Sequence, residues 1–159
     1  MKWTGLGLAL VAGGTFWLTQ ALAQVEPGPL PPKYVLGQEQ YVQRCNSCHL
    51  ALPPETFPSQ TWRTLLSQSN HYGKNLPEIG SLERQLIYLY LKDYSRTLKE
   101  GEAIPYYLSE SRYFRALHPK VVLPRPLNTQ SCTQCHQGAK QGNYQATAQM
   151  LTPDTPARP

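Results

Sequence analysis

Two short motifs of one type, one in each half of the chain, carry the residues that could do chemistry. Each has two cysteines separated by two residues and followed at once by a histidine: Cys45-Asn-Ser-Cys48-His49 and Cys132-Thr-Gln-Cys135-His136. Thiols and imidazoles at this spacing can form disulfides, hold a zinc ion, act as a redox pair or attach a haem. The surrounding sequence has to discriminate among these four kinds of site.

Three of the four kinds of site leave part of the pattern unexplained. Disulfides are the ordinary use of four cysteines in an exported protein, but they require neither the tight pairing nor the histidines. A single four-thiolate zinc site would make the repeated histidine a coincidence. A thioredoxin-like redox site normally occurs once and follows a strand, and no β-rich run precedes the first motif.

Covalent haem attachment, in contrast, uses every residue of both motifs. Each thiol would add to one vinyl group of a haem. Two intervening residues place both sulfurs of a motif on one side of a helical turn, and the next imidazole then faces the iron. The sequence therefore predicts two haems c, tethered by Cys45, Cys48, Cys132 and Cys135, with His49 and His136 as proximal ligands.

Residues 1–23 have the features of an export signal. Lys2 precedes a mostly apolar run from Trp3 to Leu18, and Ala21-Leu22-Ala23 forms a small-x-small cleavage site. The run is short for a membrane span and includes four glycines, so we predict cleavage after Ala23 rather than retention as an anchor. Export to a periplasm or thylakoid lumen agrees with haem c, which is attached beyond the cytoplasmic membrane. We expect no stable membrane insertion of the mature chain.

The chain has four histidines, two more than the motifs use. Six-coordinate haem iron takes a second axial ligand, most often His or Met in electron carriers. The two methionines are unsuited, because Met1 precedes the cleavage site and Met150 lies in a Pro- and Thr-rich tail. His71 and His118 each follow a short amphipathic, aromatic-bearing segment. We therefore predict that these two histidines are the distal ligands.

The simplest pairing of ligands is local, His49 with His71 and His136 with His118, although the sequence leaves a crossed pairing open. Two histidines would saturate each iron, which argues against catalysis at the iron and favours low reduction potentials. The sequence thus predicts an electron-transfer protein and not an enzyme. The alternatives are a small peroxidase-like dihaem enzyme and a redox or gas sensor, both of which need a displaceable ligand.

The sequence patterns predict a small all-α domain. Its 159 residues, with 15 prolines and 40% hydrophobic residues, favour loops and short helices and provide little core of their own. We expect about five short helices and long loops wrapped around two covalently bound haems. The first predicted helix begins near Gly37 and runs into the first motif. Three more span 59–69, with Ser59 as N-cap, 81–98, with Ser81 as N-cap, and 109–118. The fifth predicted helix carries the second motif. In the third predicted helix, Leu82, Leu86, Leu89 and Tyr90 form the predicted core-facing stripe, widened by Ile87 and Tyr94.

The flanking segments are predicted to lie outside this domain. A proline-rich, extended leader covers 24–36, the dihaem cytochrome c domain covers 37–145, and a flexible tail covers 146–159. The formal net charge is +5, but the basic residues are scattered and form no run, so nucleic acid is not an expected partner.

Further positions around the motifs resemble the small dihaem cytochrome c family of the bacterial periplasm. In the first half these are Pro53-Pro54, Trp62 and the segment His71-Tyr72-Gly73-Lys74-Asn75; in the second half they are Tyr113, Phe114 and His118, then Ala139, Gly142 and Tyr144. The resemblance covers most of 38–145, except that 97–108 is less similar. It implies bis-histidine ligation, electron transfer, and redox partners such as membrane or soluble cytochromes.

Overall fold

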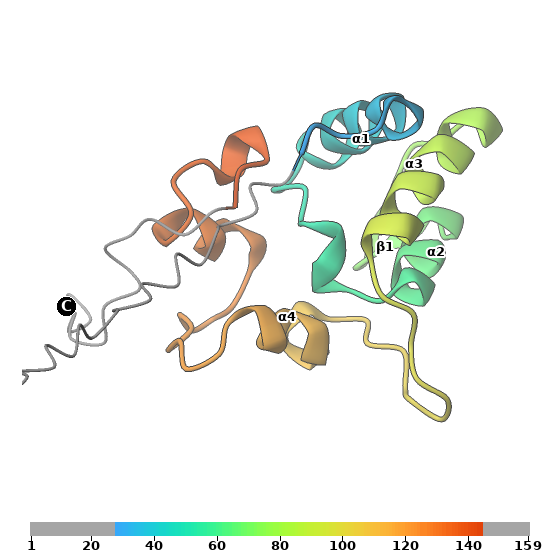
Figure 1. Ribbon diagram of the computed structural model, residues 1–159. Helices are drawn as coiled ribbons and strands as arrows, with labels where there is room; N and C mark the ends of the chain where they lie inside the picture. The colour runs from blue at the N-terminus through green and yellow to red at the C-terminus, as the bar shows by residue number, and fades with distance from the viewer. Residues whose placement is uncertain (1–27, 145–159) are drawn as a thin grey trace, which may run out of the picture.

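The computed structural model describes residues 28–144 (Figure 1). The predicted export signal, the first residues of the leader and the predicted tail lie outside the described residues. Within 28–144, none of the helices combines the length and hydrophobicity that a bilayer crossing needs.

The fold is all-α, as predicted, apart from one very short hairpin. The α-helices are α1 (Pro32–Cys45), α2 (Ser59–Ser67), α3 (Ser81–Tyr94) and α4 (Arg112–Leu117), and the 3-10 helices are η1 (Pro54–Thr56), η2 (Leu108–Glu110), η3 (Thr129–Gln134) and η4 (Ala139–Gln141). Strands β1 (Asn70–His71) and β2 (Lys74–Asn75) form the hairpin. Figure 1 shows α1, α2 and α3 grouped on one side, with α4 and the orange-to-red chain beyond it on the other.

Helix α1 begins at Pro32. The predicted helix start near Gly37 was therefore wrong, and residues 32–36 of the predicted extended leader are helical. A proline in the first turn lacks only an amide that the helix would leave unpaired, and its fixed φ favours the helix. Tyr34, in this first turn, is buried and donates a hydrogen bond of 2.7 Å to Asp93 of α3. Contact with α3 therefore extends α1 toward the N-terminus.

Helices α1 and α3 pack closely because Gly37 has no side chain. A Cβ at this position would lie 2.3 Å from the carbonyl oxygen of Leu86. The buried core formed around this contact contains Tyr34, Tyr41, Ala51, Leu52, Phe57, Trp62, Ile87, Tyr90 and Leu91. Residues 34–91 thus supply the main hydrophobic core.

The prediction for the core-facing stripe of α3 was right for Ile87 and Tyr90 and wrong for Leu82 and Leu89. The buried residues of this helix are Ile87, Tyr90 and Leu91, whereas the side chains of Leu82 and Leu89 are 68% and 38% exposed. The i, i+3, i+4 spacing of the buried set is helical, but an evenly apolar helix presents several such stripes. The close approach at Gly37 decides which stripe is covered.

The helix boundaries also differ in detail from those predicted. Ser59 and Ser81 are the first residues of α2 and α3 and not their caps, which are Pro58 and Gly80. The predicted helix over 109–118 is divided, because the buried Ser111 caps α4 by accepting a hydrogen bond from the amide of Phe114. Such shifts of one or two residues do not change the positions of the motifs.

Candidate functional site

Both Cys-x-x-Cys-His motifs adopt a single tight turn. The amide of His49 donates to the carbonyl of Cys45 at 3.4 Å, and the amide of His136 donates to that of Cys132 at 2.7 Å. The first motif leaves the C-terminal end of α1, as predicted. The second lies on the 3-10 helix η3 and not on a regular α-helix. An i to i+4 turn keeps both thiols on one side and places the imidazole immediately after them.

None of the four cysteines forms a disulfide, whereas a disulfide framework would pair them. A metal ion held only by side chains needs at least three ligands close together. Within residues 28–144, no group of three His, Cys, Asp or Glu side chains is placed to bind such an ion. Burial, followed by the charge of Cys48, raises the pKa of Cys45 to about 12. Burial also raises the pKa of Cys132. Such thiols differ from the activated cysteines of redox enzymes, whose pKa values are lowered.

His49 and His71 face each other across the first candidate site. Their ring centroids are 5.9 Å apart and their planes are within 7° of parallel. A histidine nitrogen lies about 2 Å from a bound metal ion, so two imidazoles on opposite sides of one ion have centroids roughly 6 Å apart. The separation in this pair fits a single iron held between the two rings.

The hairpin positions His71 at the end of β1. Tyr72 and Gly73 form its two-residue turn, with φ values of 51° and 83°, which is the backbone geometry that tight hairpins require. The Tyr72 hydroxyl donates to the carbonyl of Tyr106 at 2.7 Å, and the Tyr72 amide donates to the Tyr106 hydroxyl at 3.2 Å. The distal histidine is therefore held by long-range contacts as well as by its own turn.

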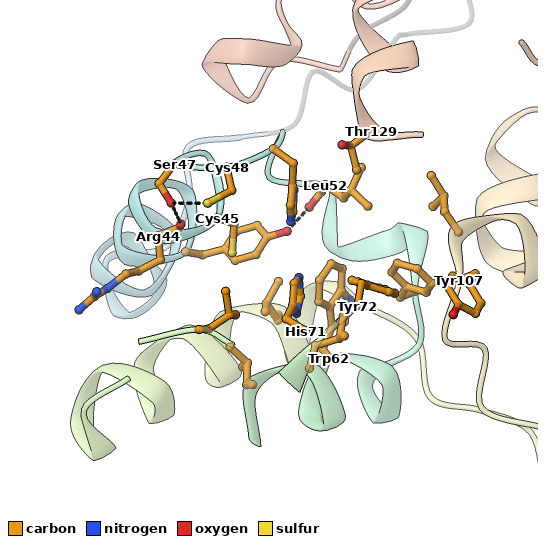
Figure 2. Close-up of a pocket in the computed structure, with 18 of the residues that line it drawn as sticks. Arg44, Cys45, Ser47, Cys48, Leu52, Trp62, His71, Tyr72, Tyr107 and Thr129 are labelled. Carbon is orange, nitrogen blue, oxygen red and sulfur yellow. Dashed lines mark hydrogen bonds between the residues drawn. The ribbon is translucent and has the colours of Figure 1, made fainter. Parts of the chain in front are cut away.

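A cavity of about 560 Å³ lies between these two histidines. Figure 2 shows Cys45 and Cys48 on one side of it and His71, Trp62 and Tyr72 on the opposite side. Its volume falls within the range of about 300–1,000 Å³ that is typical of cofactor sites. The apolar lining consists mainly of Leu52, Phe57, Trp62, Leu65, Leu66, Leu76, Pro77, Ile79, Leu91 and Leu108. A flat, largely apolar group with covalent tethers on one wall fits this cavity.

The second half of the chain closes part of the first cavity. Leu127, Asn128 and Thr129, which lie a few residues before the second motif, belong to its lining. Sequence reasoning missed this contribution, because nothing in the local pattern links residues 127–129 to a site built around residue 49. Figure 2 shows Thr129 at the edge of the cavity, on a different segment from the other labelled residues.

One basic residue, Arg44, lines the cavity, and its charge is already compensated. Its guanidinium donates two hydrogen bonds to the Glu83 carboxylate, of 2.6 and 2.9 Å. This contact lowers the pKa of Glu83, so the pair is ionised at neutral pH. Because the two charges nearly cancel, Arg44 does little to favour the reduced or the oxidised state of a bound redox group.

His118 and His136 form the second candidate pair. Their ring centroids are 6.0 Å apart, close to the first pair, but their planes are inclined at 75°. His118 lies at the end of α4, where its ring is 4.5 Å from that of the buried Phe114. His71 and His118, the two histidines outside the motifs, therefore each lie next to the motif histidine of their own half of the chain. This corresponds to the local pairing and not to the crossed one.

Hydrogen bonds orient one histidine in each pair. Nδ1 of His49 lies 2.8 Å from the carbonyl of Leu50, and Nδ1 of His118 lies 2.9 Å from that of Phe114. A carbonyl only accepts, so Nδ1 carries the proton and Nε2 keeps the lone pair that a metal needs. Nδ1 of His71 and of His136 is buried without a hydrogen-bond partner. Burial, followed by the charge of His49, lowers the pKa of His71, which favours its neutral form.

Comparisons with known proteins identify the family to which the chain is similar. A family model for dihaem cytochrome c matches residues 41–144. A search of curated proteins found no match. Among solved structures, the chain is similar to a diheme cytochrome c from Rhodobacter sphaeroides, at 26% identity and a TM-score of 0.51, over 66% of this chain and 94% of that one.

Two further solved structures show related similarity. One is DHC purified from Rhodobacter sphaeroides, at 28% identity and a TM-score of 0.48, covering 66% of this chain and 95% of that one. The other is a diheme cytochrome type c from Shewanella baltica OS155, at 23% identity and a TM-score of 0.46, covering 67% and 85%.

Proposed function

This chain belongs to the dihaem cytochrome c family and carries two haems c, and on that premise we propose that it is an exported electron-transfer protein with bis-histidine ligation at both irons. Cys45, Cys48, Cys132 and Cys135 tether the haems. His49 and His136 are the proximal ligands, and His71 and His118 are the distal ones. The mature chain begins at Gln24.

The observation that carries this proposal is the distance within each histidine pair. The centroid separations are 5.9 and 6.0 Å in two unrelated local structures. Both match the separation expected for two imidazoles bound on opposite sides of one metal ion. The pairing of each motif histidine with the spare histidine of its own half supports local over crossed ligation. A saturated iron leaves no site for peroxide or oxygen, which favours electron transfer over an enzyme or a gas sensor.

The bound haems supply a reversible one-electron couple, and the protein residues set its surroundings. The apolar walls around His71, including Trp62 and Phe57, exclude water from the first site. The backbone carbonyls beside His49 and His118 hold the imidazoles in the ligating tautomer. We expect potentials below those of His/Met cytochromes, because Met ligation raises the potential. The partners are other redox proteins, either membrane or soluble cytochromes.

The test is to remove each distal histidine in turn from the holoprotein. His71→Ala and His118→Ala should each convert one haem to the high-spin state, seen in the visible and EPR spectra of the oxidised protein, and should allow that haem to bind carbon monoxide. The wild-type protein should be fully low-spin and should not bind carbon monoxide. Asn75→Ala and Lys120→Ala, which change exposed residues close to the two histidines, are the matched controls.

Two results would contradict the proposal. If either histidine variant remains fully low-spin, that histidine is not a ligand. If the wild-type protein binds carbon monoxide at neutral pH, one axial position is open or displaceable, and the enzyme or sensor alternative gains support.

A further inference from the structure

Tyr144 links the two candidate haem sites directly. Its hydroxyl donates a hydrogen bond of 2.8 Å to the carbonyl of Ala51, two residues after His49. Its ring centroid lies 5.7 Å from that of His136, at an interplanar angle of 56°. One side chain therefore contacts the backbone next to one motif histidine and the ring of the other.

Asn46, inside the first motif, forms a second link between the same two segments. Its Oδ1 accepts a hydrogen bond of 2.6 Å from the amide of Ala51, and its Nδ2 donates one of 3.4 Å to the carbonyl of Lys140. Ala51 is thus held from both sides, by Asn46 at its amide and by Tyr144 at its carbonyl.

The turn after the second motif determines where Tyr144 lies. Gly142 caps the end of η4, and its φ of 77° is in the left-handed region that glycine adopts without strain. A Cβ on Gly138 would lie 2.9 Å from that of Asn143, so the turn is tightly closed. This closure directs the chain back from His136 toward the first motif.

We propose that Tyr144 is a positioning residue that couples the two haem sites, setting their relative placement through its contacts with Ala51 and with the ring of His136. The proposal rests on the bis-histidine electron-transfer function proposed above. Exchange between the sites moves one electron from the reduced to the oxidised haem, with no proton transferred and no bond formed or broken. Its rate depends steeply on the separation and orientation of the two sites, which Tyr144 and Asn46 constrain.

Two substitutions separate the hydrogen bond of Tyr144 from its ring. Tyr144→Phe keeps the ring beside His136 and loses the bond to Ala51, whereas Tyr144→Leu loses both. Without this bond, hydrogen–deuterium exchange of the amides in 138–144 and 50–52 should be about fivefold faster in the holoprotein. Electron exchange between the haems, measured in half-reduced protein by NMR exchange spectroscopy, should slow from wild type to Tyr144→Phe and slow further in Tyr144→Leu.

The controls keep a structural effect apart from a loss of coupling. Tyr88→Phe removes a hydroxyl on α3 that accepts a bond from Arg63, and should change neither measurement. Asn46→Ala breaks the second link and should also slow electron exchange, which provides an independent arm if Tyr144→Leu does not fold. All variants should stay low-spin at both haems.

Unchanged electron exchange in Tyr144→Phe and Asn46→Ala, with both haems low-spin, would overturn the inference and leave the proposed function intact. A high-spin or carbon monoxide-binding wild-type protein would instead refute the proposed ligation itself. The two failures are therefore distinguishable.

Discussion

The imidazole rings of His49 and His71 lie within 7° of parallel, with their centroids 5.9 Å apart. The second pair has almost the same separation, but its planes are inclined at 75°. The difference follows from how the distal histidines are held. His71 is placed by a hairpin turn, whereas His118 caps a short helix and bonds back to the carbonyl of Phe114.

The two haems should therefore give different EPR signals. Parallel ligand planes separate the energies of the iron d orbitals that interact with the imidazoles, whereas perpendicular planes leave them nearly equal. Oxidised protein at low temperature should show one ordinary rhombic low-spin signal and one highly anisotropic signal at lower field. His71→Ala should remove only the rhombic signal and His118→Ala only the other. Two identical rhombic signals would contradict the geometry.

Protein made without haem attachment should be largely unfolded. The cavity of about 560 Å³ borders the same Tyr41, Phe57 and Trp62 that form the core. Without haem these core side chains would line a solvent-filled space, and the apolar burial that stabilises the domain by only a few kcal/mol would be largely lost. Far-UV circular dichroism of the product of a strain lacking haem-attachment machinery measures this. A native-like helical spectrum would refute the prediction.

Two substitutions on α3 should differ sharply in their effect on stability. Ile87→Ala removes a side chain that is 1% exposed and should lower the free energy of unfolding by about 2–5 kcal/mol. Leu82→Ala removes one that is 68% exposed and should change it by less than about 0.5 kcal/mol. Denaturant titration of the holoproteins gives both values. Equal losses would mean that the predicted Leu82 stripe faces the core after all.

Acid should weaken the attachment of α4 through Glu102. The Arg112 guanidinium, bonded to this carboxylate, lowers the pKa of Glu102 from an ordinary value of 4.5 to about 2. Because the folded-state pKa is lowered, the stabilisation is complete above about pH 4.5 and is lost as the pH falls toward 2. Glu102→Gln should therefore have a lower thermal midpoint at pH 7, and the difference from wild type should shrink in acid. A constant difference at all pH values would exclude this mechanism.

Candidate site residues could be proposed from the sequence because covalent haem attachment depends on local spacing. Two Cys-x-x-Cys-His motifs indicate two haems without reference to any distant residue. Counting the remaining histidines then identified His71 and His118 as candidate ligands. The helical class followed from the same local patterns, since hydrophobic periodicity is encoded within a few turns of the chain.

Long-range packing decided what these local patterns left open. The covered face of α3 depends on the approach of α1 at Gly37, and the start of α1 depends on the burial of Tyr34 against α3. The angles within the histidine pairs and the contact of Tyr144 with Ala51 join residues far apart in the chain. Motif spacing alone thus indicated which residues are candidates to bind haem. Tertiary structure decided how the two candidate sites are oriented and joined, because orientation depends on contacts that no short segment contains.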